Sequence, residues 1–322
     1  MPPTQNTSRR RTPCRGCGQA LEKAFDSIEP GFEVHRCPSC GMGRTWPDVP
    51  SHEIGRFYPA VYYGKENVRF HPLLERLTRL FRLRRARVVR QRVKPGTALD
   101  VGCGRGFTLS YLESLGFKAH GMEISDTAAW HARNVLGIEV ETGDFLKSSH
   151  QKDLYNVVIF WHSLEHLPGP IEALGRAHAL LRKGGLLVVA VPNFDSLQAR
   201  LFGRYWFHLD IPRHYFHFGK NTLKKTLHSQ GFRIVQMNHG SFEQNPYGWL
   251  QSFYNALGFD NNFLYSILKN KTARTHQIRQ HPIQTALTLI LLPLFSLFSL
   301  ALMLVETALR QGGSIEVYAV KR

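Results

Sequence analysis

Short apolar runs alternate with helix-forming stretches through the middle of the chain. Each run is four to seven residues long, and the longer segments between the runs have apolar residues at helical spacing. The runs that we interpret as strands cover residues 97–101, 118–123, 138–141, 155–161 and 186–191. This alternation is typical of α/β proteins, so we predict a doubly wound parallel sheet with helices on both faces.

The pattern continues past residue 220 and is then interrupted. Residues 221–229 predict a helix, residues 232–237 a sixth strand, and residues 314–320 alternate as a final strand. The 75 residues between the last two strands, 239–313, form an insertion. Because loops of this length in compact domains are usually functional, we predict a helical insertion with a role of its own.

The insertion ends in an apolar segment, residues 284–305. It contains no Asp, Glu, Lys or Arg and is long enough to cross a bilayer. A single crossing would separate the final strand from the sheet, so we favour attachment to one membrane face as a helical hairpin broken near Pro293. A protein-buried lid or a dimer interface is the alternative. Upstream aromatic residues would then lie at the membrane interface: Trp249, Phe253, Tyr254, Phe259, Phe263 and Tyr265.

A basic helix is predicted ahead of the first strand, over residues 71–93. It holds eight arginines and one glutamate, and residues 47–70 before it read as a linker. Its apolar stripe consists of Leu73, Leu77, Leu80, Phe81 and Val88. The arginines would either form a solvated face on a helix that caps the cofactor pocket or dock to phosphates, such as those of an anionic membrane surface.

Composition limits the partners without choosing among them. The chain has 322 residues and a formal net charge of +17, which favours nucleic acid, an anionic membrane face or an acidic substrate. No apolar stretch follows the basic residues 9–11, so we expect no secretory signal and a cytoplasmic protein, peripheral or monotopic on the inner face of the membrane. Residues 1–11 are expected to be a disordered tail.

Four of the five cysteines form two Cys-x-x-Cys pairs. Cys14 and Cys17 make the first, and Cys37 and Cys40 the second, each pair being followed by glycine. Two such knuckles give a closed tetrahedral set of thiolates, so residues 12–46 predict a zinc ribbon with a structural metal. A disulfide pair or a redox dithiol is the alternative, and a cytoplasmic location disfavours the disulfide.

The first strand leads into a glycine-rich turn. Residues 99–107 read Leu-Asp-Val-Gly-Cys-Gly-Arg-Gly-Phe, with glycines at Gly102, Gly104 and Gly106. Glycines let backbone N–H groups and a helix N-terminus approach a nucleoside ligand closely. A pyrophosphate site would require a different glycine spacing, and the carboxylate of Asp100 would repel phosphate. The turn therefore predicts a nucleoside cofactor that carries a cation.

These residues resemble the first motif of class I S-adenosylmethionine-dependent methyltransferases. The resemblance covers residues 97–192 and implies a Rossmann-like seven-stranded sheet, with the last strand inserted antiparallel beside the sixth. Residues 95–238 and 314–322 would form this domain. The resemblance also implies that Glu123 binds the ribose hydroxyls, that Asp144 binds the adenine amino group and that Phe145 packs on the adenine ring.

The acceptor site is expected at the carboxyl ends of the strands. His162, Glu165 and His166 follow the fourth strand, in a segment that resembles ubiquinone-biosynthesis O-methyltransferases. His166 is the first candidate base, with Glu165 orienting it, and His214 is a second candidate base or orienter. Alternatively, Glu165 and His166 cap the next helix and His214 is a lid residue. A histidine at position 162 makes a magnesium site less plausible.

The sequence therefore favours a methyltransferase that acts on a small-molecule or lipid-like acceptor, by O-methylation at the membrane surface. A nucleic-acid methyltransferase is the first alternative, on charge and the zinc ribbon, although Phe160-Trp161-His162 replaces the segment typical of base-nitrogen methylation. A nucleotide-sugar methyltransferase is the second, because comparable N-terminal zinc modules occur there. A non-enzymatic membrane scaffold is disfavoured by the intact acidic residues of the cofactor motifs.

Overall fold

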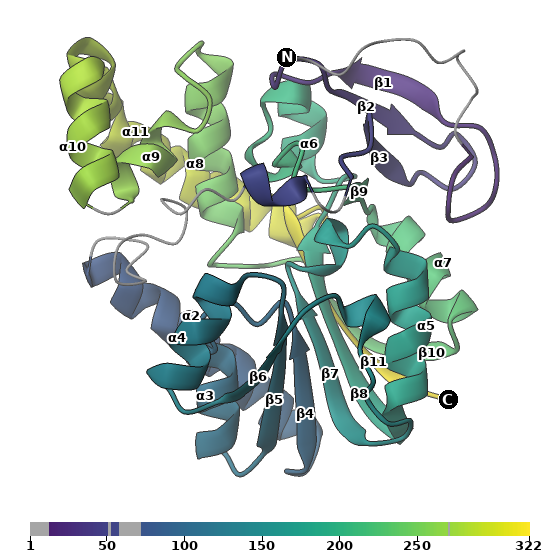
Figure 1. Cartoon of the computed structure of the whole chain (residues 1–322). Helices are drawn as coiled ribbons and strands as arrows, with labels where there is room; N and C mark the ends of the chain where they lie inside the picture. The colour runs from purple at the N-terminus through teal and green to yellow at the C-terminus, as the bar shows by residue number, and fades with distance from the viewer. Residues whose placement is uncertain (1–12, 51–52, 58–71, 270) are drawn as a thin grey trace.

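A seven-stranded sheet forms the centre of the computed structural model, which describes residues 13–50, 53–57, 72–269 and 271–322 (Figure 1). The tail at residues 1–11 and residues 58–70 of the predicted linker lie outside these ranges. The strands are, in chain order, β4 (Thr97–Val101), β5 (Lys118–Glu123), β6 (Glu139–Thr142), β7 (Tyr155–Trp161), β8 (Leu181–Pro192), β10 (Phe232–Asn238) and β11 (Ser314–Lys321).

The spatial order of the strands is β10-β11-β8-β7-β4-β5-β6. The five neighbouring strands β8, β7, β4, β5 and β6 pair in parallel. Strand β11 runs antiparallel between β8 and β10. The predicted seven-stranded fold, including the antiparallel insertion of the last strand, is confirmed.

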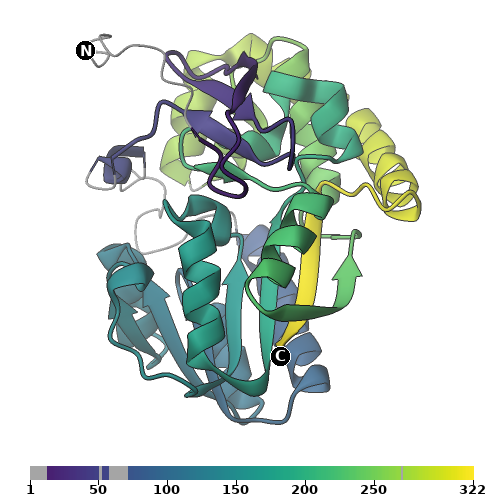
Figure 2. The same cartoon turned by 90° about the vertical axis from the view of Figure 1, so that its right-hand side faces the viewer.

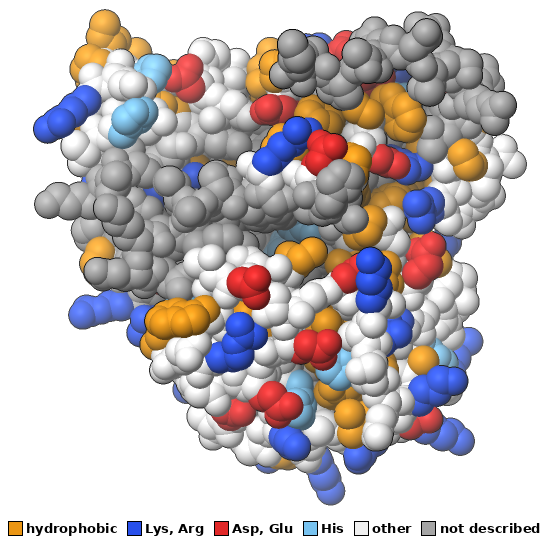
Figure 3. All heavy atoms as spheres, in the orientation of Figure 1, with side chains coloured by type: hydrophobic (Ala, Val, Ile, Leu, Met, Phe, Trp, Pro, Cys, Tyr) orange, Lys and Arg blue, Asp and Glu red, His pale blue; other side chains and the backbone are white. Residues whose placement is uncertain are grey.

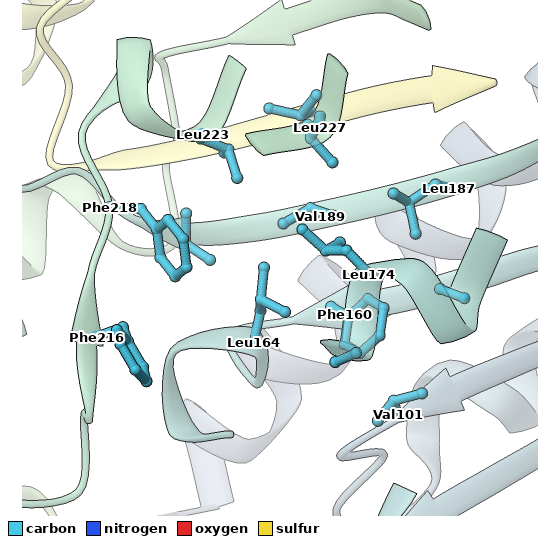
Figure 4. Packing of buried hydrophobic residues seen from close by; sticks show 14 of the residues in the cluster. Val101, Phe160, Leu164, Leu174, Leu187, Val189, Phe216, Phe218, Leu223 and Leu227 are labelled. Atoms are coloured by element: carbon cyan, nitrogen blue, oxygen red, sulfur yellow. The ribbon is translucent and has the colours of Figure 1, made fainter. Parts of the chain in front are cut away.

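Helices cover both faces of the sheet because its strands are apolar on both sides. Val158 and Phe160 of β7 belong to the core under α5 (Pro170–Leu180) and α7 (Lys220–Ser229), which Figure 4 shows from close by. Val157 and Ile159 belong to the core on the other face. That face is covered by α2 (Pro72–Arg92), α3 (Phe107–Ser114) and α4 (Asp126–Asn134).

The cysteine-containing segment forms a second sheet above the first (Figures 1 and 2). Its strands are β1 (Glu22–Asp26), β2 (Glu33–Arg36) and β3 (Gly43–Trp46), all antiparallel. A fourth strand, β9 (Phe216–His217), joins it from the middle of the chain. The cysteine module is therefore paired directly with the segment that contains His214.

The insertion is helical, as predicted. It contains α8 (Asn245–Ala256), α9 (Phe263–Leu268), α10 (Lys271–Gln280) and α11 (Pro282–Ala308), and α6 (Leu197–Phe202) packs against α8. Short 3-10 turns cover Ile54–Phe57, Phe145–Lys147 (η3), Leu164–His166 (η4), Gly203–Tyr205 and Phe207–Leu209.

The expected hairpin within residues 284–305 is wrong. The segment belongs to one continuous helix, α11, with Pro293 inside it. Pro293 is exposed, and a proline inside a helix costs about 3 kcal/mol through a lost hydrogen bond and a clash with the preceding turn. The contacts of α11 with α8 are extensive enough to offset this cost.

The expected interfacial role of the aromatic cluster is also wrong. Trp249 and Tyr254 are 0% exposed and Phe263 is 1% exposed, and the other three aromatics of the cluster are at least partly buried. Phe253 and Tyr254 pack on Phe295 of α11 with ring centroids 5.2 and 5.1 Å apart. These contacts place the aromatic side chains between α8 and α11, inside the insertion.

Candidate active site

The glycine-rich turn lies between β4 and α3, where close packing requires small residues. A Cβ on Gly102 would approach the Cβ of Ser163 to 2.6 Å, and one on Gly106 would approach the Cβ of Ala132 to 2.7 Å. Gly104, by contrast, would meet nothing within 4 Å. The outer glycines therefore pack the turn against its neighbours, and the middle one leaves space for a ligand.

Asp100 is buried at the end of β4, with 4% of its surface exposed. Its Oδ1 makes no hydrogen bond with any described residue, and burial raises the pKa of its carboxyl to about 7, against the opposing charge of Arg85. A buried carboxylate oxygen without a partner is costly unless a ligand supplies a donor. Asp100 therefore fits the ammonium of an amino-acid ligand.

Glu123 already bridges the end of β5 to the glycine turn. Its carboxylate accepts hydrogen bonds from the backbone N–H of Gly104 at 2.8 Å and of Ser125 at 2.9 Å. Burial raises the pKa of Glu123. This places Glu123 beside the turn, as a ribose-binding residue would require.

Asp144 and Phe145 are less directly placed. Asp144 accepts a hydrogen bond from the N–H of Leu146 at 3.0 Å, at the start of η3. Phe145 is 2% exposed and packs edge-on against Phe160 in the core. Neither is among the residues that line the cavity described next, so their roles toward an adenine stay predictions.

A cavity of about 650 Å³ extends from the glycine turn to the insertion. It is bounded by the glycine turn, the end of β7, the segment from Phe207 to His214, and helices α2, α8, α9 and α11. Its lining includes Asp100, Gly104, Phe107, Trp161, His162, His166, His208, His214, Glu243, Tyr247, Ser296, Ser299 and Leu300. The cofactor turn and the candidate acceptor residues therefore share one space.

The basic helix α2 forms one wall of this cavity, in agreement with the alternative that it caps the cofactor pocket. Arg85 stacks over the Trp161 ring at 4.3 Å and forms an ion pair with Glu243. Arg82 also lines the cavity, and burial lowers its pKa to about 10. Of the predicted apolar stripe, Leu77 and Leu80 are exposed, whereas Ala86 and Val89 pack into the core. The arginines on this side of α2 are neither solvated nor available to an external phosphate.

Glu165 is the most deeply buried acid of the acceptor end, with 1% of its surface exposed. Among the described residues, neither carboxylate oxygen has a hydrogen-bond partner, but its Oε1 lies 3.3 Å from Nδ1 of His162 and 4.0 Å from Nε2 of His214. The His166 and His214 rings meet edge to face with centroids 4.5 Å apart. The structure thus brings together all four residues predicted for catalysis.

In His166 and His214, the backbone partner of Nδ1 shows which ring nitrogen carries the proton. Nδ1 of His214 lies 3.1 Å from the carbonyl oxygen of His208, and Nδ1 of His166 lies 3.0 Å from that of Arg213. Because a carbonyl can only accept, Nδ1 carries the proton in both neutral rings, which leaves Nε2 as the basic atom. Burial, and after it the charge of His166, lowers the pKa of His214 well below its ordinary value, so this ring is neutral at physiological pH.

Two further features of this end escaped the sequence reasoning. Asp210 places its Oδ2 3.7 Å from Nε2 of His214, a contact for which the i to i+4 spacing was the available signal. His162 has a φ of 52°, a strained conformation for a side chain of its size. Its backbone N–H donates to Ala190, so the end of the sheet holds that conformation.

The four N-terminal cysteines converge as a zinc site would require. Their Sγ atoms all lie within 4.8 Å of one another, with Cys14 to Cys40 and Cys17 to Cys37 at 3.4 Å. All five cysteines of the chain are free thiols. Four thiolates at this separation match a tetrahedral zinc site, which has Zn–S bonds of about 2.3 Å. Glu165, His166 and His214 also converge, but two imidazoles do not suit magnesium.

The fold and the cavity define a class of protein, the α/β enzymes that bind a nucleoside cofactor at the carboxyl ends of parallel strands. Residues 71–237, just over half of the chain, match the methyltransferase domain family. The chain belongs to this family, and its architecture is that of class I S-adenosylmethionine-dependent methyltransferases.

Curated relatives match over shorter stretches. A 37.1 kDa protein in transposon TN4556 of Streptomyces fradiae is 34% identical over 32% of this chain and 32% of its own length. The ubiquinone biosynthesis O-methyltransferase of Caulobacter vibrioides is 32% identical over 30% of this chain and 41% of its own length. The ubiquinone biosynthesis O-methyltransferase of Parvibaculum lavamentivorans is 28% identical over 57% of this chain and 70% of its own length. The chain thus spans less than half of the first two relatives.

Solved structures with a similar fold include a SAM-dependent methyltransferase from Archaeoglobus fulgidus. It is 19% identical, with 75% of this chain and 93% of that chain covered and a TM-score of 0.49. A possible histamine N-methyltransferase from Thermotoga maritima is 16% identical, with 78% and 92% covered and a TM-score of 0.46.

Proposed function

We propose that this protein transfers a methyl group from S-adenosylmethionine to a hydroxyl of an amphiphilic, lipid-like acceptor at a membrane surface. The observation that carries the proposal is the course of the cavity. Its lining joins Asp100 and the glycine turn, the histidines His162, His166 and His214, and Ser296, Ser299 and Leu300 of α11. The same helix exposes an apolar face on its other side.

The residues at the glycine turn fit this cosubstrate. Asp100 would hold the ammonium of its amino-acid end, Glu123 the ribose hydroxyls and Asp144 the adenine amino group. Bound S-adenosylmethionine supplies an electrophilic methyl group on a sulfonium. The protein must then hold the acceptor oxygen in line with that group and remove its proton.

The histidine cluster supplies the base. Nε2 of His214 or His166 would take the proton from the acceptor hydroxyl as the oxygen forms its bond to the methyl carbon. The ring becomes positively charged, and the buried carboxylate of Glu165 beside it stabilises that charge. Because neither Glu165 oxygen is hydrogen-bonded, the carboxylate is available for this role.

The apolar helix α11 favours a membrane over an aqueous acceptor because its amphipathic pattern is inverted. Its buried residues include Thr285, Thr288, Ser299 and Glu306. Its outward side carries one stripe of exposed apolar residues at intervals of three and four: Ile283, Leu287, Ile290, Leu294, Leu297, Ala301 and Leu304. Only 17% of its most apolar 18-residue window is buried, and the helix lies at the edge of the molecule in Figure 2. Such a face suits contact with lipid in the plane of one leaflet.

The surface charge gives less support to a nucleic-acid acceptor. On the face drawn in Figure 3, Lys and Arg side chains are interspersed with Asp and Glu instead of forming one stripe. The net charge of +17 would instead strengthen attraction to an anionic leaflet.

Native mass spectrometry of the protein extracted from membranes tests the acceptor class. We expect a copurified amphiphile in the wild-type protein and its loss in Ser296→Phe, which fills the far end of the cavity. Leu297→Phe, one residue along on the outward face, is the matched control and should retain the ligand. Equal ligand in both variants would place it outside the cavity and contradict the proposal.

A further inference from the structure

The cysteine module contacts the acceptor segment through strand pairing. β3 begins three residues after Cys40 and pairs antiparallel with β9, with Gly43 opposite His217. The approach is close, because a Cβ on Gly43 would lie 2.8 Å from the Cβ of His217. The second cysteine knuckle and the segment that contains His214 are therefore joined by one sheet.

Thr45 of β3 is the most connected residue of this junction and is 2% exposed. Its N–H donates to the carbonyl of Tyr215 at 3.0 Å, and its hydroxyl donates to the carbonyl of His214 at 2.6 Å. Nε2 of His217 lies 3.0 Å from the same hydroxyl oxygen. Because the single hydroxyl hydrogen is used on His214, the His217 ring must donate. Thr45 thus fixes the backbone position of His214 and the tautomer of His217.

The other side of the same segment is held by the catalytic turn η4. The N–H of Tyr215 donates to the carbonyl of Glu165 at 2.9 Å. Phe216 and Phe218 lie near Leu164 of that turn in Figure 4. Cys14, Cys37 and Met42 belong to the same buried cluster as these phenylalanines. The His214 segment is consequently clamped between the cysteine module and η4.

We propose that the cysteine module is part of the acceptor-site scaffold, and that Thr45 is a positioning residue that aligns His214 with Glu165. The inference rests on the proposed function only in the role it gives to His214. A zinc ion on the four cysteines would fix the knuckle from which β3 starts, and so fix the position of Thr45. The acceptor site would then depend on the metal although none of the four N-terminal cysteines lines the cavity.

The imidazole ¹⁵N signals of His214 test this without any acceptor. Spectra are compared for the full-length protein with bound S-adenosylmethionine, with His214 assigned from His214→Asn. We expect the His214 signals to shift in Thr45→Val, which lacks the hydroxyl. In Thr45→Ser, which keeps the hydroxyl, they should match those of the wild-type protein. S-adenosylmethionine affinity should stay within about twofold in both, since Thr45 does not touch the glycine turn.

Thr285→Val is the matched control. The Thr285 hydroxyl donates to the carbonyl of His281 at 2.8 Å, and Thr285 is 7% exposed, so the variant removes a similar buried hydrogen bond within the insertion and leaves the contacts of Thr45 in place. Its spectrum should match that of the wild-type protein. Unchanged His214 signals in Thr45→Val, or equal shifts in Thr45→Val and Thr285→Val, would overturn the proposal.

Hydrogen exchange after chelation tests whether the acceptor segment depends on zinc bound by the four cysteines. Removal of zinc should raise deuterium uptake in residues 212–218 and leave residues 97–107 unchanged. Uptake confined to residues 13–46 would contradict the coupling. The ¹⁵N signals and the deuterium uptake could stay unchanged in a protein that transfers methyl groups, which would contradict only the positioning role of Thr45. They could also change as expected in a protein without methyl transfer, which would contradict only the proposed function.

Discussion

We expect Asp100 to give the site a preference for a cationic ligand, and this preference should depend on pH. Burial raises the pKa of its carboxyl to about 7, and an ammonium binds the ionised form. The ionised fraction falls about tenfold for each pH unit below the pKa and levels off above it. S-Adenosylmethionine affinity, measured by calorimetry, should therefore weaken about tenfold from pH 8 to pH 6.

Asp100→Asn separates this effect from the titration of other groups. The variant should bind more weakly at pH 8 and show a flat profile, because the amide does not ionise. A slope that persists in Asp100→Asn would assign the pH dependence to another residue.

Glu165 and the two histidines are expected to act on transfer and not on cosubstrate binding. Glu165→Gln keeps the size of the side chain but removes the charge that stabilises the protonated histidine. Methyl transfer should fall by about 10² to 10⁴, the range of general-base effects, with S-adenosylmethionine affinity within about twofold. His166→Asn and His214→Asn, compared in the same transfer assay, identify the base as the histidine with the larger loss. Full activity in Glu165→Gln would make that residue structural.

The exposed stripe of α11 gives a prediction for membrane binding. The double variant Ile290→Asp, Leu297→Asp places two charges on outward positions that are 71% and 68% exposed, where folding is little affected. Flotation with anionic liposomes should be lost, because each charge at bilayer depth costs about 3 kcal/mol. Val235→Asp, an exposed apolar position on β10, should float as the wild type does. Unchanged flotation, or a dimer that dissociates in the double variant, would assign the stripe to a protein interface.

The cysteine knuckles predict one zinc ion per chain. Metal analysis of the purified protein should find it, and Cys37→Ser should lose it and lower the melting temperature, because structural zinc contributes folding free energy directly. A disulfide between any of Cys14, Cys17, Cys37 and Cys40 would rule the zinc site out.

The periodicity of the sequence predicted the positions of the strands well, but it predicted poorly how α11 packs against the rest of the molecule. The strands could be predicted because β4, β7 and β8 are buried on both faces and give continuous apolar runs. The hairpin near Pro293 was a wrong expectation, because a proline on the exposed side of a helix leaves the neighbouring contacts intact. The pattern of α11 did not say which face turns inward, since its buried residues include polar ones such as Thr288 and Glu306 while many of its leucines are exposed.

The candidate site was predictable where the chemistry is local. His162, Glu165 and His166 lie within five residues at the end of one strand, and their position followed from the fold. The contact of Thr45 with His214 spans 169 positions, and the stacking of Arg85 on Trp161 depends on the rotation of α2, so neither leaves a signal in the sequence. The tautomers of the histidines depend on such backbone contacts and were equally out of reach.

The parallel sheet and the insertion both line the cavity, and the cysteine module pairs with β9, which follows the cavity residue His214. Under the proposed function, the sheet would hold the cosubstrate, the cysteine module would support the acceptor segment, and the insertion would provide the wall that continues into the apolar helix. Under that proposal, methyl transfer and membrane attachment would therefore occur on the same side of the molecule.

Transfer of a labelled methyl group tests that account most directly. The protein is incubated with methyl-labelled S-adenosylmethionine and with the membrane lipids of its source organism as liposomes, together with nucleic acid and sugar nucleotides, and Asp100→Ala is the inactive control. The account predicts label in a small organic-phase product with the wild-type protein and none with the control. Label that appears only in nucleic acid or in a water-soluble sugar nucleotide would contradict it.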